Sequence, residues 1–175
     1  MNLETKRLYL RPLKYEDANG NYPNWLNDKT VCRYNSHGDT LYTKEMALKY
    51  IDMVNNSPKY RVFAIMDKKE DGHIGNISLQ QIDQTNKKAE FAILIGERNF
   101  WGKGYAKEAG KLLIDYGFSK LNLREIYCGT SEENLPMQRL AISLNMKLKN
   151  ISRKDFKKDG CYFDTYHYSL LSDSI

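Results

Sequence analysis

The stretch from Ala89 to Lys107, AEFAILIGERNFWGKGYAK, decides how this chain is interpreted. It starts with an apolar run typical of a strand, continues through a short polar loop, and reaches Gly102 and Gly104 directly before a helical pattern. A glycine-rich turn between a strand and a helix points several backbone N–H groups in one direction, at the positive end of the helix dipole. The stretch therefore predicts a loop that binds an anion.

Two well-known phosphate loops fit this stretch poorly. The P-loop pattern G-x-x-x-x-G-K-[ST] has four residues between its glycines, whereas five separate Gly96 from Gly102, and Gly104 stands where the magnesium-binding hydroxyl belongs. The dinucleotide pattern G-x-G-x-x-G has a third glycine or alanine where this chain has Lys107. Nucleoside triphosphate hydrolysis and NAD binding are therefore disfavoured.

The segment Trp101-Gly102-Lys103-Gly104-Tyr105-Ala106 resembles the pyrophosphate loop of the Gcn5-related N-acetyltransferases, the GNAT superfamily, whose pattern is [QR]-x-x-G-x-[GA]. It matches at Gly104 and Ala106, and Trp101 replaces the usual first residue. Together with the following Lys107-Glu108-Ala109, it is similar to the branch that contains ribosomal-protein alanine acetyltransferases and spermidine acetyltransferases. The resemblance implies an α/β (α+β) fold: a mixed, mostly antiparallel, twisted sheet of six to seven strands, flanked by helices and splayed between its fourth and fifth strands.

The composition is that of an ordinary globular protein. With 175 residues, 41% apolar and 28% charged, the chain is expected to form one acetyltransferase domain, residues 1–175, large enough to bury roughly two-thirds of its unfolded surface. No run of about 18 apolar residues predicts a membrane span, and the N-terminal sequence lacks the apolar segment of a secretory signal. Cys32, Cys128 and Cys161 are widely spaced, which predicts free thiols in a reducing compartment and a cytoplasmic location.

The net charge of +5 is moderate and its lysines are scattered. Their one cluster, residues 153–158, includes an acid, which favours a solvated hairpin over a nucleic-acid surface. A basic chain also suits a polyanionic cofactor. We therefore expect no nucleic-acid partner, and a monomer or a homodimer.

The rest of the chain predicts an order of elements. Residues 7–13 alternate like a half-buried strand, and Pro12 limits that strand to an edge or an end. Residues 14–40 are irregular and aromatic-rich and are expected to hold short helices, and a longer helix should follow Thr43, a residue suited to an N-cap, as far as residues 55–58. Further elements are predicted as strands at 61–66, 73–82 and 89–95, a helix after the glycine loop to about 121, a strand at 125–130, a helix at 134–145, and a hairpin of 148–156 with 161–171. This is also the order of the GNAT fold.

The resemblance implies that acetyl-CoA is the cofactor and assigns residues to it. The pyrophosphate would bind backbone amides of the loop Trp101, Gly102, Lys103, Gly104, Tyr105 and Ala106. The pantetheine arm would pair with the main chain at Leu94, Ile95 and Gly96, where Gly96 is either a bulge or strand end that allows close approach, or a plain turn glycine. Asn134 either contacts the cofactor arm or caps the helix that follows it.

For the reaction, Glu90 is the candidate general base, at the start of the strand that would hold the cofactor. Deprotonation through water, and a solvent-facing role for Glu90, remain open. Many superfamily members carry a tyrosine or a serine on the last long helix as the acid for the thiolate, but Ala141 and Met137 occupy those positions. Water, another hydroxyl (Tyr105, Tyr127 or Tyr166), or a loss of activity would account for the missing acid.

Acceptor recognition is expected between the first strand and the second long helix and at the last hairpin. The segment Trp25-Leu26-Asn27-Asp28 resembles a segment of related acetyltransferases, so Trp25, Asn27 and Asp28 are candidate acceptor residues. An amino sugar, a polyamine or a protein N-terminus would suit. The three histidines show no ligand spacing, so no metal site is expected.

The sequence thus predicts an acetyl-CoA-dependent N-acetyltransferase that acts on a primary amine, with a slight preference for a small molecule. The alternative is a non-catalytic acyl-CoA-binding sensor or partner protein of the same fold, suggested by the absence of the usual hydroxyl residues at Met137 and Ala141. An RNA-binding module is a third, remote interpretation.

Overall fold

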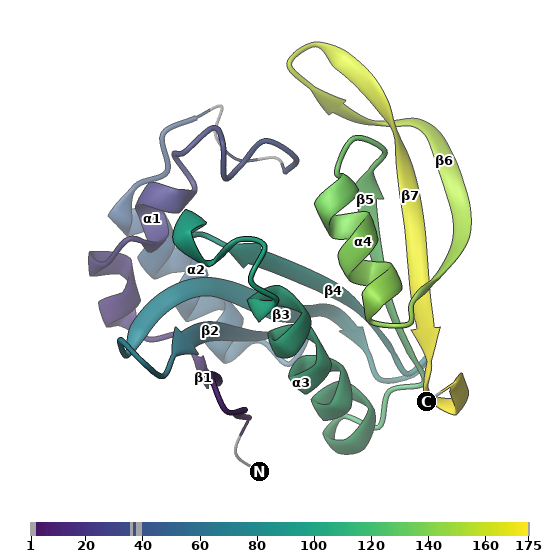
Figure 1. The fold of residues 1–175 in the computed structure, drawn as a ribbon, viewed down its shortest axis with the longest axis horizontal. Helices are drawn as coiled ribbons and strands as arrows, with labels where there is room; N and C mark the ends of the chain where they lie inside the picture. Colours follow the sequence, from purple (N-terminus) through teal and green to yellow (C-terminus); the bar gives the residue numbers. More distant parts are fainter. Residues whose placement is uncertain (1–2, 36, 38–39, 175) are drawn as a thin grey trace.

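The computed structural model describes residues 3–35, 37 and 40–174, and these form a seven-stranded mixed sheet with helices on both faces (Figure 1). The strands are β1 (Leu8–Pro12), β2 (Arg61–Asp67), β3 (Gly72–Asp83), β4 (Lys88–Ile95), β5 (Glu125–Ser131), β6 (Lys147–Lys158) and β7 (Cys161–Leu171). The α-helices are α1 (Tyr22–Trp25), α2 (Lys44–Asn56), α3 (Tyr105–Lys120) and α4 (Leu135–Ser143), and the 3-10 helices are η1 (Tyr15–Asn19), η2 (Arg98–Phe100) and η3 (Ser172–Ser174). The spatial order of the strands is β1-β2-β3-β4-β5-β7-β6.

Two apolar cores lie on opposite faces of this sheet. Strand β2 shows the division, because alternate side chains point to opposite faces: Phe63 and Ile65 pack in one core, and Ala64 packs in the other. Helices α3 and α4 cover the first core, and η1, α1 and α2 cover the second. The near-continuous burial of β2 follows from this double cover.

The sheet splits between β4 and β5. These strands are parallel and pair only from Lys88 to Glu90 with Glu125 to Tyr127, whereas β4 stays paired with β3 along its length, up to Gly75 opposite Ile95. Figure 1 shows β4 and β5 meeting at the lower right and diverging upward. The predicted splay between the fourth and fifth strands is confirmed, and one edge of β4 is left without a strand partner beyond Glu90.

Local signals in the sequence explain where the main helices begin. The hydroxyl of Thr43 accepts a hydrogen bond from the amide of Met46 at 3.3 Å and caps α2, as predicted. The side chain of Asn134 accepts from the amide of Met137 at 3.2 Å and caps α4. Gly104 precedes α3 with a φ of 82°, a conformation that favours glycine.

The predicted elements are all present, with shifted ends. The first strand is shorter than predicted, 8–12 instead of 7–13, and the last helix covers 135–143 instead of 134–145. The predicted short helices within 14–40 are η1 and α1, and residues 36, 38 and 39 of that segment lie outside the described residues. Cys32, Cys128 and Cys161 are free. None of the described helices is long and apolar enough to cross a membrane.

Candidate active site

The unpaired edge of β4 presents the main chain of alternate residues. The amide of Gly96 donates to Ile74 on β3 at 2.9 Å, so with the antiparallel register the polar groups of Leu94 also face β3. The main-chain groups of the intervening residues, Ile93 and Ile95, face the gap between β4 and β5. A strand-like ligand would therefore pair with Ile93 and Ile95.

This geometry changes part of the pantetheine prediction. Ile95 faces the gap as expected, but the indole of Trp101 already donates to its carbonyl at 2.7 Å. Leu94 and Gly96 are directed at β3 instead, because β4 alternates its hydrogen-bonding sides. Ile93 faces the gap instead, and the sequence offers no signal for this phase because it depends on which neighbouring strand each residue bonds. The assignment of these residues to the pantetheine arm stays a prediction.

Gly96 allows a close approach, but the neighbour is a side chain of this protein. A Cβ atom built on Gly96 would lie 1.9 Å from Cδ2 of Trp25, so the indole ring rests on the main chain at the end of β4. Trp25 is 5% exposed and donates from its ring nitrogen to Glu97 at 3.0 Å. Gly96 thus follows the last residue of β4 and permits a close approach, and the group that approaches it is the Trp25 ring.

The glycine loop has the conformation of an anion cradle. Gly102 and Gly104 have φ values of 71° and 82°, and a Cβ on Gly102 would meet no atom within 4 Å. No side chain caps α3 at Gly104, so the first amides of the helix, including those of Tyr105 and Ala106, lack intrahelical partners. Open space beside unpaired amides at the positive end of a sixteen-residue helix suits a diphosphate.

A guanidinium group from β1's N-terminal side holds this loop. Arg7 donates to the carbonyl of Lys103 at 3.0 Å and to the carboxylate of Glu108 at 2.8 Å, and its guanidinium carbon lies 4.4 Å from the ring centroid of Tyr105. A Cβ on Gly104 would lie 3.6 Å from this guanidinium.

Tyr105 is tied to the base of the loop. Its hydroxyl donates to Asp67 at 2.8 Å, and this hydrogen bond raises the pKa of Tyr105. Asp67 is 2% exposed and also accepts from the amides of Lys69 and Glu70. The Tyr105 hydroxyl therefore anchors the loop and is not free to serve as the missing acid.

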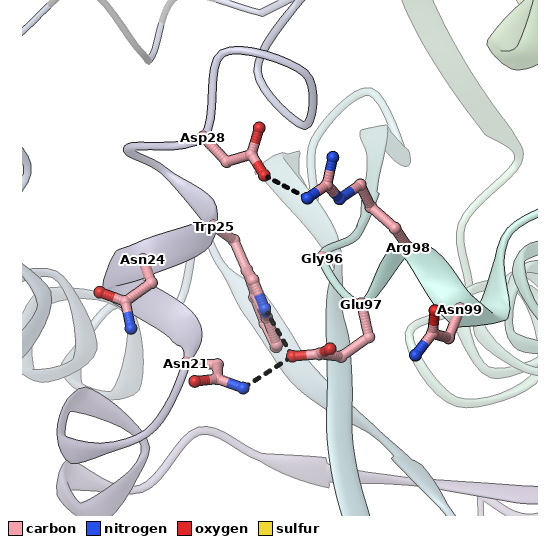
Figure 2. A pocket seen from close by; sticks show the side chains of 8 residues that line it. All are labelled: Asn21, Asn24, Trp25, Asp28, Gly96, Glu97, Arg98 and Asn99. Atoms are coloured by element: carbon pink, nitrogen blue, oxygen red, sulfur yellow. Dashed lines mark hydrogen bonds and ion pairs between the residues drawn. The ribbon is translucent and has the colours of Figure 1, made fainter.

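A polar cavity of about 300 Å³ lies between α1 and the end of β4 (Figure 2). Figure 2 shows Glu97 receiving hydrogen bonds from Trp25 and Asn21, while Asp28 faces Arg98 at 3.7 Å on the opposite side. These contacts join the helical segment after β1 to the loop that leads to the glycines. Through these contacts, a movement of either segment would displace the other.

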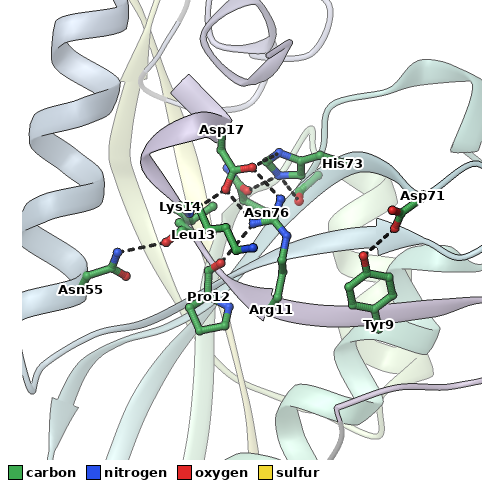
Figure 3. A network of polar contacts seen from close by, with 11 residues as sticks. Tyr9, Arg11, Pro12, Leu13, Lys14, Asp17, Asn55, Asp71, His73 and Asn76 are labelled. Atoms are coloured by element: carbon green, nitrogen blue, oxygen red, sulfur yellow. Dashed lines mark hydrogen bonds and ion pairs between the residues drawn. The ribbon is translucent and has the colours of Figure 1, made fainter. Parts of the chain in front are cut away.

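The same segment rests on a polar network around Asp17 (Figure 3). Arg11 binds the carboxylate of Asp17 with two hydrogen bonds, of 2.6 and 2.8 Å, and the ring of His73 lies 3.5 Å from it. Although burial alone raises the pKa of Asp17, the hydrogen bonds from Arg11, His73 and the Lys14 amide lower it below its ordinary value. The other ring nitrogen of His73 donates to the carbonyl of Gly75 at 3.0 Å, so the network reaches β3.

The three candidate acceptor residues all take part in holding their own loop. Trp25 is buried against Gly96, and Asn27 donates to the carbonyls of Pro23 and Tyr42 and accepts from the Tyr42 amide. Asp28 accepts hydrogen bonds from the amides of Thr30 and Val31. These bonds lower the pKa of Asp28, although desolvation opposes them. Their assignment to the acceptor stays a prediction, and of the three, Asp28 is the one whose carboxylate faces a cavity.

Glu90 lies at the foot of the split, at the last β4 residue that pairs with β5. Its neighbours Ala89 and Phe91 pack in the core under α3 and α4, so its side chain points to the opposite face of the sheet. Gln81 donates to its carboxylate at 2.9 Å. Burial raises the pKa of Glu90, and the contacts with Gln81 and His167 oppose this effect.

The two α4 positions considered for the acid, Met137 and Ala141, carry no hydroxyl group. Ala141 is fully buried and Met137 packs against the core, both on the face away from Glu90. Asn134 is the helix cap, and a role toward the cofactor stays a prediction. Tyr166 also packs toward that core, whereas Tyr127, opposite Glu90 in the register, lies on the face that carries Glu90.

A second cavity, of about 210 Å³, lies on this face between the loop after α1 and the β6–β7 hairpin. The ammonium group of Lys158 on the hairpin donates to the carbonyl of His37 at 2.9 Å and so bridges the two segments. The lining combines aromatic rings with charges of both signs: Arg33, Tyr34, Ser131, Glu133, Phe156, Lys158, Asp159, Cys161 and Phe163. Sequence reasoning assigned acceptor recognition to these regions but did not identify these residues.

The chain matches the family model described as "Acetyltransferase (GNAT) domain" over residues 7–147. It belongs to the GNAT acetyltransferase family. A relative, the uncharacterized N-acetyltransferase p20 of Bacillus licheniformis, is 38% identical over 173 residues, which are 97% of this chain and 95% of that protein. The spermidine N(1)-acetyltransferase of Escherichia coli strain K12 is 29% identical over 154 residues, 87% of this chain and 80% of that protein.

The fold of this acetyltransferase has solved counterparts. The crystal structure of spermidine N-acetyltransferase from Vibrio cholerae in complex with CoA and spermine has a TM-score of 0.87, with 24% sequence identity, and the match covers 97% of this chain and 98% of that one. As a family member the protein is an N-acetyltransferase that uses acetyl-CoA. The non-catalytic alternative is thus set aside.

The residues present fit that cofactor. A diphosphate needs open amides, which the loop supplies at positive-φ glycines, and an amide-containing arm needs a free strand edge, which β4 supplies beyond Glu90. Acetyl-CoA would bring an activated acetyl thioester to the split. The described residues contain no group of three or more histidine, cysteine, aspartate or glutamate side chains suited to a metal ion.

Proposed function

We propose that this acetyltransferase modifies the primary amine of a small cationic molecule, and that a polyamine is the first candidate. The observation that carries the proposal is the placement of Glu90: a half-buried carboxylate at the foot of the split, on the face that also holds the second cavity. A carboxylate there would attract an ammonium group and accept a proton from it. Similarity to spermidine N-acetyltransferases supports this substrate class.

The proposed cofactor contacts follow from the same geometry. The amides of residues 102–106 would bind the diphosphate, and the main chain of Ile93 and Ile95 would pair with the pantetheine arm. The sulfur would then lie along the β4 edge, nearer to Glu90 than to the glycines. Glu90 would receive a proton from the ammonium and release it to water, because its raised pKa favours proton transfer near neutral pH.

The test is an acceptor panel with free thiol as the readout. The purified protein and acetyl-CoA are mixed in turn with spermidine, glucosamine and an alanyl peptide, and Glu90→Gln is measured beside the wild type. We expect thiol release with spermidine, and a rate at least about 100-fold lower in Glu90→Gln. Release with glucosamine or the peptide alone would contradict the polyamine assignment, and an unchanged rate in Glu90→Gln would contradict its role.

A further inference from the structure

The face of the sheet that carries Glu90 also carries a histidine that no part of the proposed reaction uses. On β7, Tyr166 and Tyr168 pack toward the core under α3 and α4, so His167 between them points to the opposite face. Strand β7 pairs with β5, and His167 lies directly opposite Gly129. Position and face thus place His167 beside the split, two residues farther along β5 than the level of Glu90.

Gly129 leaves the space between this ring and the split open. A Cβ built on Gly129 would lie 3.3 Å from Cγ2 of Thr165, 3.6 Å from Nδ1 of His167 and 3.7 Å from its Cε1. The Nδ1 edge of the ring therefore faces β5, and β4 lies beyond it. A glycine inside a strand weakens the strand and commonly marks a place that another group must approach. Here the missing side chain means that no Cβ of β5 stands next to the Nδ1 edge of the ring.

The other ring nitrogen is held from the opposite side. Nε2 of His167 lies 2.9 Å from the hydroxyl of Ser152 on β6, the strand on the far side of β7. If Nε2 carries the proton and donates to this hydroxyl, Nδ1 keeps its lone pair and can accept a proton. Ser152 would thus fix both the orientation and the tautomer of the ring.

We propose that His167 is the group that moves the second proton of the reaction, from the attacking amine to the departing sulfur. The proposal rests on the function proposed above. An ammonium substrate must lose two protons on its way to an amide, and Glu90 accounts for the first, which leaves to solvent. Nδ1 takes the second as the nitrogen–carbon bond forms, and gives it to the sulfur as the carbon–sulfur bond breaks. The ring returns to its starting form, and no other acid is required.

This assignment accounts for the acid that α4 lacks. Met137 and Ala141 offer no proton and lie on the opposite face, whereas His167 reaches the split across Gly129. A single imidazole that first accepts and then donates a proton is an established device in acyl transfer.

The first test is kinetic and compares three variants. His167→Gln removes the base, Gly129→Ala places a methyl group about 3.6 Å from Nδ1 while keeping the histidine, and Ser169→Ala removes, on the same strand and face, a buried hydroxyl with no partner among the described residues. With spermidine, or whichever panel amine reacts, we expect kcat to fall about 100-fold in His167→Gln and measurably in Gly129→Ala, and to stay unchanged in Ser169→Ala. The KM for acetyl-CoA should stay the same in all three.

The second test needs no acceptor. In ¹⁵N NMR spectra of the imidazole rings, the signals absent from the His167→Gln spectrum belong to His167, and we expect these to shift when CoA is added to the wild type. The thermal stabilisation by CoA should be equal in the wild type and His167→Gln. If CoA binds but the His167 signals do not shift, or if kcat is unchanged in His167→Gln, the role of His167 is overturned while the proposed cofactor site stands. A wild type that does not bind CoA would overturn the proposed cofactor site instead.

Discussion

The contact between Arg7 and the glycine loop gives the sharpest test of how the loop is held. Arg7 donates to the carbonyl of Lys103, and this draws that carbonyl to the outer side of the loop, leaving the following amides for an anion. Substitution by glutamine removes the charge, the ion pair with Glu108 and the contact with the Tyr105 ring. The loop then keeps its glycines but loses the contacts by which Arg7 holds it.

Arg7→Gln is expected to affect both the stability of the protein and its affinity for CoA, and the two effects can be measured separately. The side chains of Arg7 and Glu108 are 42% and 21% exposed, so solvent screens the ion pair, which contributes about 0.5 kcal/mol to the free energy of unfolding. Loss of the ion pair alone should lower the melting temperature of Arg7→Gln by about 1–2 °C, and loss of the other two contacts of Arg7 lowers it further. The hydrogen bond to Lys103 and the stacking on Tyr105 add about 1–2 kcal/mol that must be restored when CoA binds. The Kd for CoA should thus rise about 10-fold.

Calorimetric titration with CoA measures this Kd directly, and melting curves give the stability. The matched control is Lys68→Gln, which breaks the pair between Lys68 and Glu4, 2.7 Å long, of comparable exposure and also beside β1. Lys68→Gln should bind CoA as the wild type does. Equal Kd values for Arg7→Gln and the wild type, or an equal weakening in Lys68→Gln, would refute the reasoning.

Three further variants test other parts of the structure. Glu90 acts as a base only when the pH exceeds its pKa, which burial raises above the ordinary value of about 4.5. The kcat/KM should therefore rise with pH above about 4.5, and a pH–rate profile of Glu90→Gln should lack this rise. Gly96→Ala should lose about 3 kcal/mol of stability, because its methyl group meets the Trp25 ring at 1.9 Å; an unchanged melting temperature would show that the ring yields. Asp17 has a lowered pKa in the folded protein, so its ionised form stabilises the fold above about pH 4, and this contribution is lost as the pH falls further. Asp17→Asn should therefore melt earlier than the wild type at pH 7, by a difference that narrows as the pH falls below about 4, and equal melting temperatures at pH 7 would be inconsistent with the network around Arg11.

The order of elements and the glycine loop were predictable because their signals are local. The 3.6-residue spacing of apolar residues gave α2 and α4, Thr43 and Asn134 were correctly considered as caps, and turn residues separated β2, β3 and β4. The positive φ angles of Gly102 and Gly104 are the physical reason that a glycine pattern marks the loop. Because the motif consists of these glycines, the loop can be predicted from the sequence without knowledge of the tertiary structure.

The contacts that complete the site were not predictable, because they join distant parts of the chain. Arg7 reaches a loop 96 residues away, and nothing near it in the sequence marks it as the residue that holds the loop. The sheet order places β7 between β5 and β6, so His167 comes to lie beside the split only through strand pairing. Likewise, the main chain of Ile93 rather than that of Leu94 faces the gap, because pairing with β3 sets which residues of β4 direct their polar groups away from it.

Backbone hydrogen exchange, with and without CoA, tests the central claim most directly, since the claim concerns amides rather than side chains. We expect CoA to slow exchange in peptides that cover Ile93 to Ile95 and Gly102 to Ala106, with little change in α2. Protection confined to other segments, or no protection of residues 102–106 at saturating CoA, would contradict the account.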